Sequence, residues 1–147
     1  MADPQNLFAA LDALDRPAAG ADMHALARRL FPICRSLTGA GNRETLAVLR
    51  ETLPLDIVEV PSGTPVLDWT VPPEWTVREA WIRDPAGRVV VDFRNHNLHL
   101  VGYSAPARRK LPLAELQKHL HSLPAQPDLI PYRTSYYNET WGFCLPH

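Results

Sequence analysis

The chain has 147 residues, of which 46% are hydrophobic, and this is enough to bury the core of one ordinary domain. Its formal net charge of -1 gives no electrostatic attraction to nucleic acid or to an anionic membrane, so we expect neither partner. No stretch approaches the roughly 20 apolar residues that cross a bilayer, and no signal peptide is recognisable, which favours a cytoplasmic protein.

The N-terminal part is predicted to form three amphipathic helices before any strand. Each expected helix begins at a capping side chain, in order Asp3, Asp22 and Asn42. The helices are expected to end within residues 17–20, at Pro32 and at Pro54, because proline interrupts the helical hydrogen bonds.

Residues 55–60 are rich in β-branched side chains and predict a strand. Beyond residue 61 the apolar period changes from about 3.6 to 2, which indicates a domain boundary and a small sheet. Asp84-Pro85-Ala86-Gly87 is a type I turn sequence, so we expect a hairpin of residues 77–83 with 88–93. Four later elements are expected, namely a strand over 98–103, a short helix from Pro112, and strands over 132–137 and 141–145.

These elements predict an α+β fold, with helices first and then a small antiparallel sheet that carries one helix. We expect three parts: a leader helix over residues 1–21, a helical part over 22–60, and a small β-rich domain over 61–147.

The six histidines do not form a recognisable metal motif. In a regular strand His96 and His99 face opposite sides, and on a helix His119 and His121 are about 200 degrees apart, so neither pair chelates well. There is no HExxH motif and no cysteine cluster, since Cys34 and Cys144 are far apart and are interpreted as core residues. We therefore assign no metal ligand, no cofactor and no catalytic residue to this chain.

Aromatic residues are the more informative feature, because aromatic side chains with polar tips line ligand sites as well as cores. Tyr136 and Tyr137 cannot both point inward from one strand, and alternation places Tyr137 and Trp141 on the same side. One of these faces is therefore expected to lie at a cleft or an interface.

Several segments together resemble one known family. They include Ile33-Cys34-Arg35-Ser36-Leu37-Thr38-Gly39, Asp68-Trp69-Thr70-Val71-Pro72-Pro73-Glu74-Trp75, Asn97-Leu98-His99-Leu100-Val101-Gly102-Tyr103, His119-Leu120-His121 and Trp141-Gly142-Phe143-Cys144. The chain from about residue 22 to 147 is similar to bacterial aminopeptidase-like proteins associated with polysaccharide biosynthesis. Members of that family resemble zinc aminopeptidases in fold, and they carry a small inserted domain of unknown function and a C-terminal winged helix.

The resemblance implies that residues 22–60 begin an incomplete zinc-aminopeptidase-like lobe and that residues 61–147 are the inserted domain. Family members are much longer, and their zinc site resembles a His-x-Asp arrangement beyond the Trp-Gly-Phe-Cys segment, with no counterpart here. We therefore expect the N-terminal third of a zinc-dependent hydrolase that is not catalytically competent alone. The expected partner is the missing part of the lobe or a second copy. The five side chains expected at a cleft or interface are Tyr136, Tyr137, Trp141, His99 and His121.

A second interpretation remains open. The chain can instead be a binding module that uses the aromatic face of its sheet to recognise a peptide, a glycan or a partner protein.

Overall fold

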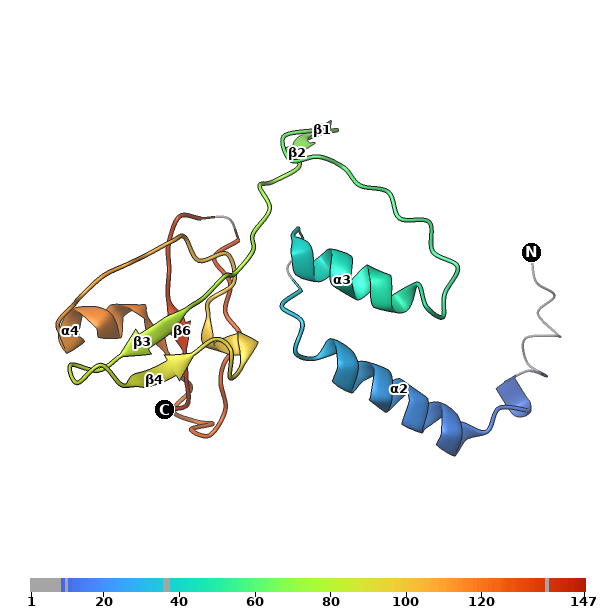
Figure 1. Ribbon diagram of the computed structural model, residues 1–147, viewed down its shortest axis with the longest axis horizontal. Coiled ribbons are helices and arrows are strands. Elements are labelled where there is room, and N and C mark those ends of the chain that lie inside the picture. The colour runs from blue at the N-terminus through green and yellow to red at the C-terminus, as the bar shows by residue number, and fades with distance from the viewer. Residues whose placement is uncertain (1–8, 10, 36–37, 137) are drawn as a thin grey trace. The chain divides into compact units, whose positions relative to one another are not determined.

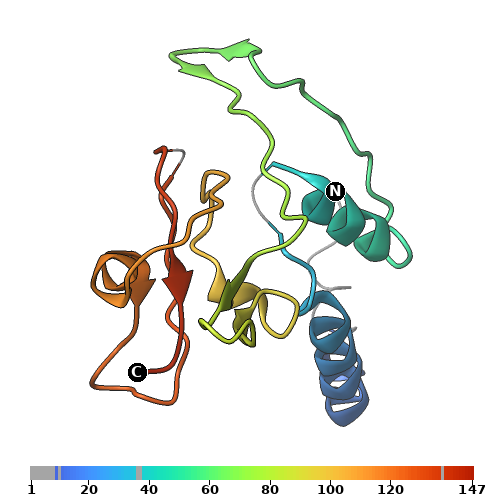
Figure 2. The same ribbon diagram turned by 60° about the vertical axis from the view of Figure 1, so that its left-hand side comes forward.

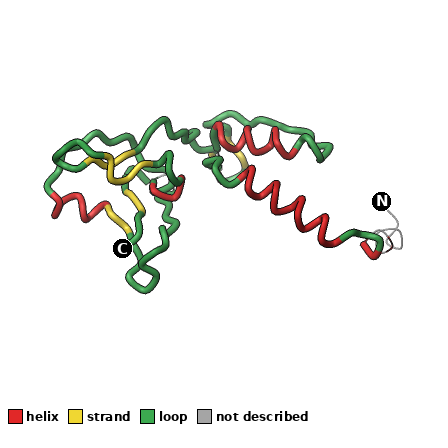
Figure 3. The backbone as a smooth tube through the Cα atoms, turned by 60° about the horizontal axis from the view of Figure 1, so that its bottom comes forward, coloured by secondary structure: helices red, strands yellow, loops and turns green. Residues whose placement is uncertain are grey.

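The computed structural model describes residue 9 and residues 11–35, 38–136 and 138–147 (Figure 1). The chain divides into two compact units, Met1–Pro32 and Ile33–His147. The expected boundaries after residues 21 and 60 remain predictions. The architecture is α+β, as predicted, and Figure 3 shows that loops make up much of the backbone between short helices and strands. None of the helices in the described part is long and apolar enough to cross a membrane.

The first unit contains helix α2 (Arg16–Leu30). The Asp15 carboxylate caps it by accepting a hydrogen bond from the Ala18 N–H at 3.1 Å, and Pro17 lies in the first turn. The prediction that Asp22 caps this helix was wrong, because proline is well tolerated in a first turn, where its missing N–H has no helical partner. The helix ends just before Pro32, as expected. The predicted helix from Asp3 falls largely outside the described residues.

In the second unit, helix α3 (Ala40–Leu49) begins behind Gly39 rather than at Asn42. Gly39 has a φ of 145°, a conformation that favours glycine, and Asn42 lies in the first helical turn. The buried face of α3 carries Thr45 and Val48. The prediction failed because a glycine in an unusual conformation starts this helix without any side-chain cap.

Residues 55–60 form no strand in the structure, contrary to the prediction. The chain runs from α3 to the next hairpin as drawn-out coil, and Val58 is 83% exposed (Figure 1). The prediction failed for a physical reason, since β propensity alone does not form a strand without a neighbouring strand to pair with.

Two hairpins follow. Strand β1 (Pro65–Val66) pairs antiparallel with β2 (Trp69–Thr70), and β3 (Trp81–Arg83) pairs antiparallel with β4 (Val89–Asp92). The second hairpin confirms the prediction made from the Asp84-Pro85-Ala86-Gly87 turn. The Asp84 carboxylate closes that turn by accepting hydrogen bonds from the Arg88 N–H at 2.9 Å and from Arg88 Nε at 2.7 Å.

The last part of the chain packs around one short buried strand. The remaining elements are the 3-10 helix η1 (Asn97–His99), helix α4 (Leu113–Leu116), the 3-10 helix η2 (Gln117–His119), and strands β5 (Leu120–His121) and β6 (Phe143–Cys144). Figure 2 shows α4 beside the paired strands β5 and β6. Strand β6 is buried throughout, which confirms the prediction for the Trp-Gly-Phe-Cys segment.

Three details of this region differ from the predictions. Residues 132–136 form no regular strand, because only Thr134 makes a bridge and the chain turns at Tyr136. Strand β6 pairs parallel with β5, and the long connection over residues 122–142 allows that direction. Residues 98–103 form η1 and two isolated bridges, Leu100 to Phe143 and Gly102 to Thr134, in place of one regular strand. Tyr103 has a φ of 65°, which interrupts the extended backbone there.

Candidate functional site

Strand β6 is the centre of the candidate site, because two segments that are distant in the sequence bond to it, one on each side. Phe143 pairs with Leu120 on one side and with Leu100 on the other. The Val101 N–H donates to the Gly142 carbonyl at 3.0 Å, and the Leu145 N–H donates to the His121 carbonyl at 3.0 Å. Cys144 is fully buried, so this strand is held rigidly.

Two histidines attach their side chains to the backbone around β6. His99 Nδ1 lies 2.8 Å from the Cys144 carbonyl oxygen, and His119 Nδ1 lies 2.9 Å from that of Trp141. Since a carbonyl oxygen only accepts, both rings carry their proton on Nδ1. The His119 ring also stacks on the Trp141 ring, with centroids 3.7 Å apart and planes inclined by 10°. His99 itself belongs to η1, so its side chain links this 3-10 helix to the backbone of β6.

His121 is the third histidine near β6, and its pKa is shifted. Partial burial lowers the pKa of His121, and the positive charges of Arg133 and His119 lower it further. A histidine whose pKa is lowered is mostly neutral at pH 7. His121 belongs to β5, whereas His119 ends η2.

The aromatic candidates Tyr136 and Trp141 do not face alternate sides of a regular strand, contrary to the expectation from the sequence. Tyr136 lies in a turn with a φ of 47°, so the rule that successive strand residues face opposite sides does not apply to it. Its side chain is 68% exposed, whereas Trp141 is half-buried under His119. Tyr137 lies outside the described residues. The structure thus brings Trp141, His99 and His121 to the surroundings of β6, and it places Tyr136 in an exposed turn.

A zinc site was tested on the same residues. In residues 11–35, 38–136 and 138–147, no three His, Cys, Asp or Glu side chains lie close enough together to hold a metal ion. The described part of the chain therefore does not fit a zinc centre of its own.

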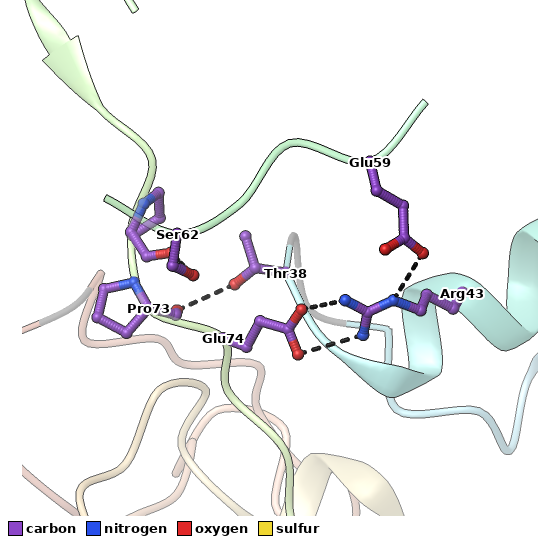
Figure 4. Close-up of polar contacts among 7 residues, drawn as sticks. Thr38, Arg43, Glu59, Ser62, Pro73 and Glu74 are labelled. Carbon is purple, nitrogen blue, oxygen red and sulfur yellow. Dashed lines mark hydrogen bonds and ion pairs between the residues drawn. The ribbon is translucent and has the colours of Figure 1, made fainter. Parts of the chain in front are cut away.

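A second cluster, which sequence reasoning missed, joins α3 to the chain around residue 74 (Figure 4). The Arg43 guanidinium forms an ion pair with both carboxylate oxygens of Glu74, and Arg43 Nε donates to Glu59 at 3.0 Å. Thr38 Oγ1 donates to the Pro73 carbonyl at 3.2 Å, and the Trp75 N–H donates to the Thr38 carbonyl at 3.2 Å. We call these five residues, with Pro73, the Arg43 junction.

Trp75 connects the Arg43 junction to residues 103 and 104. Its indole N–H donates to the Ser104 carbonyl at 3.0 Å, and its ring lies 5.6 Å from the Tyr103 ring. No local signal marks these contacts, because Arg43 and Glu74 are 31 positions apart in the sequence. A run such as Pro-Pro-Glu-Trp predicts a turn but not what the turn touches.

The ion pair of the Arg43 junction predicts how the stability of the folded chain changes in acid. The hydrogen bond from Arg43 lowers the pKa of Glu74, with a smaller opposing effect of desolvation. Because this carboxyl has a lower pKa in the folded state than its unfolded value of about 4.3, its contribution is present above that pH and is lost as pH falls. Glu74→Gln should therefore flatten the dependence of the thermal midpoint on pH below about pH 4.

Arg43→Gln removes the partner of Glu74 and should flatten the same part of the profile. Both side chains are about half exposed, so we expect salt to weaken the effect in the wild-type chain. If Glu74→Gln kept the wild-type slope, the ion pair would contribute nothing to the pH dependence.

The fold and much of the sequence are shared with known proteins. The family model described as a domain of unknown function, DUF2172, matches residues 74–147, and the chain belongs to this family. This match begins at Glu74, within the Arg43 junction.

Two matches from Clostridium acetobutylicum extend the comparison. The chain is 49% identical over 126 residues to a protein provisionally named a polysaccharide biosynthesis protein with an aminopeptidase-like domain. It is also 48% identical to the crystal structure of a protein provisionally described as a peptidase, with a TM-score of 0.85. These matches confirm the resemblance to aminopeptidase-like proteins associated with polysaccharide biosynthesis.

The matches cover a large share of this chain but a small share of the proteins that it matches. They include 86% and 88% of this chain, but only 29% of the curated relative and 31% of the crystallised chain. The chain thus spans less than a third of the length of the relatives that it matches.

Proposed function

We propose that this chain is a non-catalytic part of a zinc-dependent aminopeptidase-like hydrolase linked to polysaccharide biosynthesis. The observation that carries the proposal is the 49% identity to a relative whose name includes an aminopeptidase-like domain. Since the match occupies 29% of that relative, most of the relative is available for the hydrolytic site. The free thiols of Cys34 and Cys144 suit the reducing cytoplasm that we propose as its location.

The proposal assigns zinc to the part of the relatives that this chain does not match. Zinc bound there would act as a Lewis acid that activates water. The histidines of this chain have another use in the proposal, because His99 and His119 hold the backbone around β6. The chain's own task is then to provide a rigid wall beside the cleft.

Tyr136 is the best candidate for a residue that reaches substrate or the hydrolytic lobe. It is 68% exposed, and its phenol can offer both an apolar ring and a hydroxyl to a boundary between domains. Trp141, His99 and His121, which lie around β6, remain candidates as well, and Tyr137 is a candidate by its position in the sequence. The proposed partner is the aminopeptidase-like lobe of the longer relatives.

Metal analysis tests the assignment of zinc. We expect the purified C. acetobutylicum relative to retain about one zinc per chain after desalting, and a form of it that lacks the matched segment to retain zinc as well if it folds. We expect the 147-residue chain to retain far less than one zinc. One equivalent of tightly bound zinc on this chain, lost when His99 and His121 are replaced by alanine, would contradict the assignment.

A binding module is the second candidate function, and exposed aromatic side chains favour it. Tyr132 is 72% exposed and Tyr136 is 68% exposed. Titration of the isolated chain with short peptides and with oligosaccharides, followed by NMR, distinguishes the two functions. Saturable shifts confined to these tyrosines in the isolated chain would support the module, whereas none are expected if the surface acts only beside a hydrolytic lobe.

A further inference from the structure

Residues 55–60 combine a strand-like composition with exposed apolar side chains. In an extended chain Leu55, Ile57 and Glu59 lie on one face, and Asp56, Val58 and Val60 lie on the other. The exposed fractions of Ile57, Val58 and Val60 are 38%, 83% and 52%. Each face therefore carries apolar side chains beside one carboxylate, and these apolar side chains have little cover in the described structure.

The backbone of this segment is also unpaired within the described structure. The Leu55 N–H donates to the Leu53 carbonyl at 2.8 Å, and the next backbone donor with a described partner is Gly63, which bonds to Val71 at 2.8 Å. Residues 56–60 thus make no backbone hydrogen bond to another described residue. A drawn-out run of free N–H and C=O groups with β-branched side chains is a ready edge for pairing with another strand.

The segment is held at its C-terminal end, which reduces the ordering that pairing would require. Arg43 Nε binds the Glu59 carboxylate at 3.0 Å and ties the segment to α3 (Figure 4). Beyond it, Ser62 Oγ donates to the Pro72 carbonyl at 2.8 Å and starts the hairpin of β1 and β2. A preorganised strand loses less conformational entropy on binding than a free one.

We propose that residues 55–60 pair, as a strand, with the edge of a β-sheet in the aminopeptidase-like part that the relatives possess beyond the match. This rests on the proposed function and names its partner. The match covers 86% of this chain, and residues 55–60 lie far from both ends, so the relative contains the same segment. The other 71% of the relative is long enough to supply the sheet and the layers that cover both faces of the strand.

Hydrogen exchange tests the pairing without using activity. In this chain alone we expect the amides of residues 56–60 to exchange within about tenfold of unstructured rates. In the full-length C. acetobutylicum relative we expect the matching amides to be protected more than about 100-fold. Proline at the position that matches Val58 should abolish protection of the segment, because it removes a backbone donor, whereas threonine there should preserve it.

Fast exchange of these amides in the wild-type relative would overturn the proposal, even if the proline variant failed to fold. Protection that appears in this chain alone and rises with its concentration would overturn it as well, because it would identify a second copy as the partner. The proposed function fails by a different result, namely the absence of zinc from the relative. The two failures are therefore separable.

Discussion

Replacing Phe143 with alanine is expected to lower the free energy of unfolding of the unit Ile33–His147 by about 3 to 5 kcal/mol. Phe143 is 8% exposed and pairs on both sides within the sheet, so truncation leaves a cavity that β5 and η1 cannot readily fill. An ordinary domain is stable by about 5 to 15 kcal/mol, so the loss is large. Urea denaturation followed by tryptophan fluorescence measures it.

Phe31→Ala is the matched control, because Phe31 is 61% exposed and lies in the other unit. We expect it to change the same transition by less than about 0.5 kcal/mol. Equal effects of the two substitutions would mean that β6 is not the centre of the core.

Gly41→Ala is expected to be the second most destabilising substitution. A Cβ at this position would lie 1.9 Å from the carbonyl oxygen of Cys34, which is a backbone atom and cannot rotate away. Relief requires α3 or the preceding loop to shift, and overpacking of this kind costs about 1 to 3 kcal/mol or more. The loss should appear as a lower urea midpoint for the unit Ile33–His147 and as weaker pairing of Arg43 with Glu74.

Gly20→Ala is the control that tests whether replacing a glycine with alanine destabilises the chain at any position. Gly20 lies within α2, and a Cβ there meets no atom within 4 Å. We expect this substitution to raise the helical signal in circular dichroism, because alanine favours a helix interior by about 0.5 to 1 kcal/mol over glycine. A Gly41→Ala variant with an unchanged midpoint would show that the close approach to Cys34 is absent in solution.

Local chemistry allowed part of the fold to be predicted from the sequence. The Asp84 turn specifies its hairpin within a few residues, and the Trp-Gly-Phe-Cys segment has the composition of a buried strand. Two helix starts were wrong because Asp15 and Asp22 are equally good caps by type, and because Gly39 starts α3 through its backbone alone. Helix starts depend on conformation as much as on side-chain type.

The rest depends on contacts between distant residues. The parallel pairing of β5 with β6 and the ion pair of Arg43 with Glu74 follow from the folded chain, and no spacing in the sequence indicates them. Dependence on distant contacts also explains why the prediction for residues 55–60 failed. Their pattern is that of a strand, but no described neighbour pairs with it. Among the candidate site residues, His99 and Trp141 were proposed from their residue types, and no spacing in the sequence indicates that His99 bonds to Cys144 or that His119 stacks on Trp141.

Turnover of an aminoacyl anilide, measured in parallel for this chain and for the full-length C. acetobutylicum relative, tests the central claim most directly. We expect the relative to release the anilide in a reaction that a chelator abolishes and added zinc restores. We expect this chain to give no turnover above the buffer blank, with or without zinc. Zinc-dependent turnover by this chain that persists through repurification, or a relative with no zinc-dependent turnover, would contradict the claim.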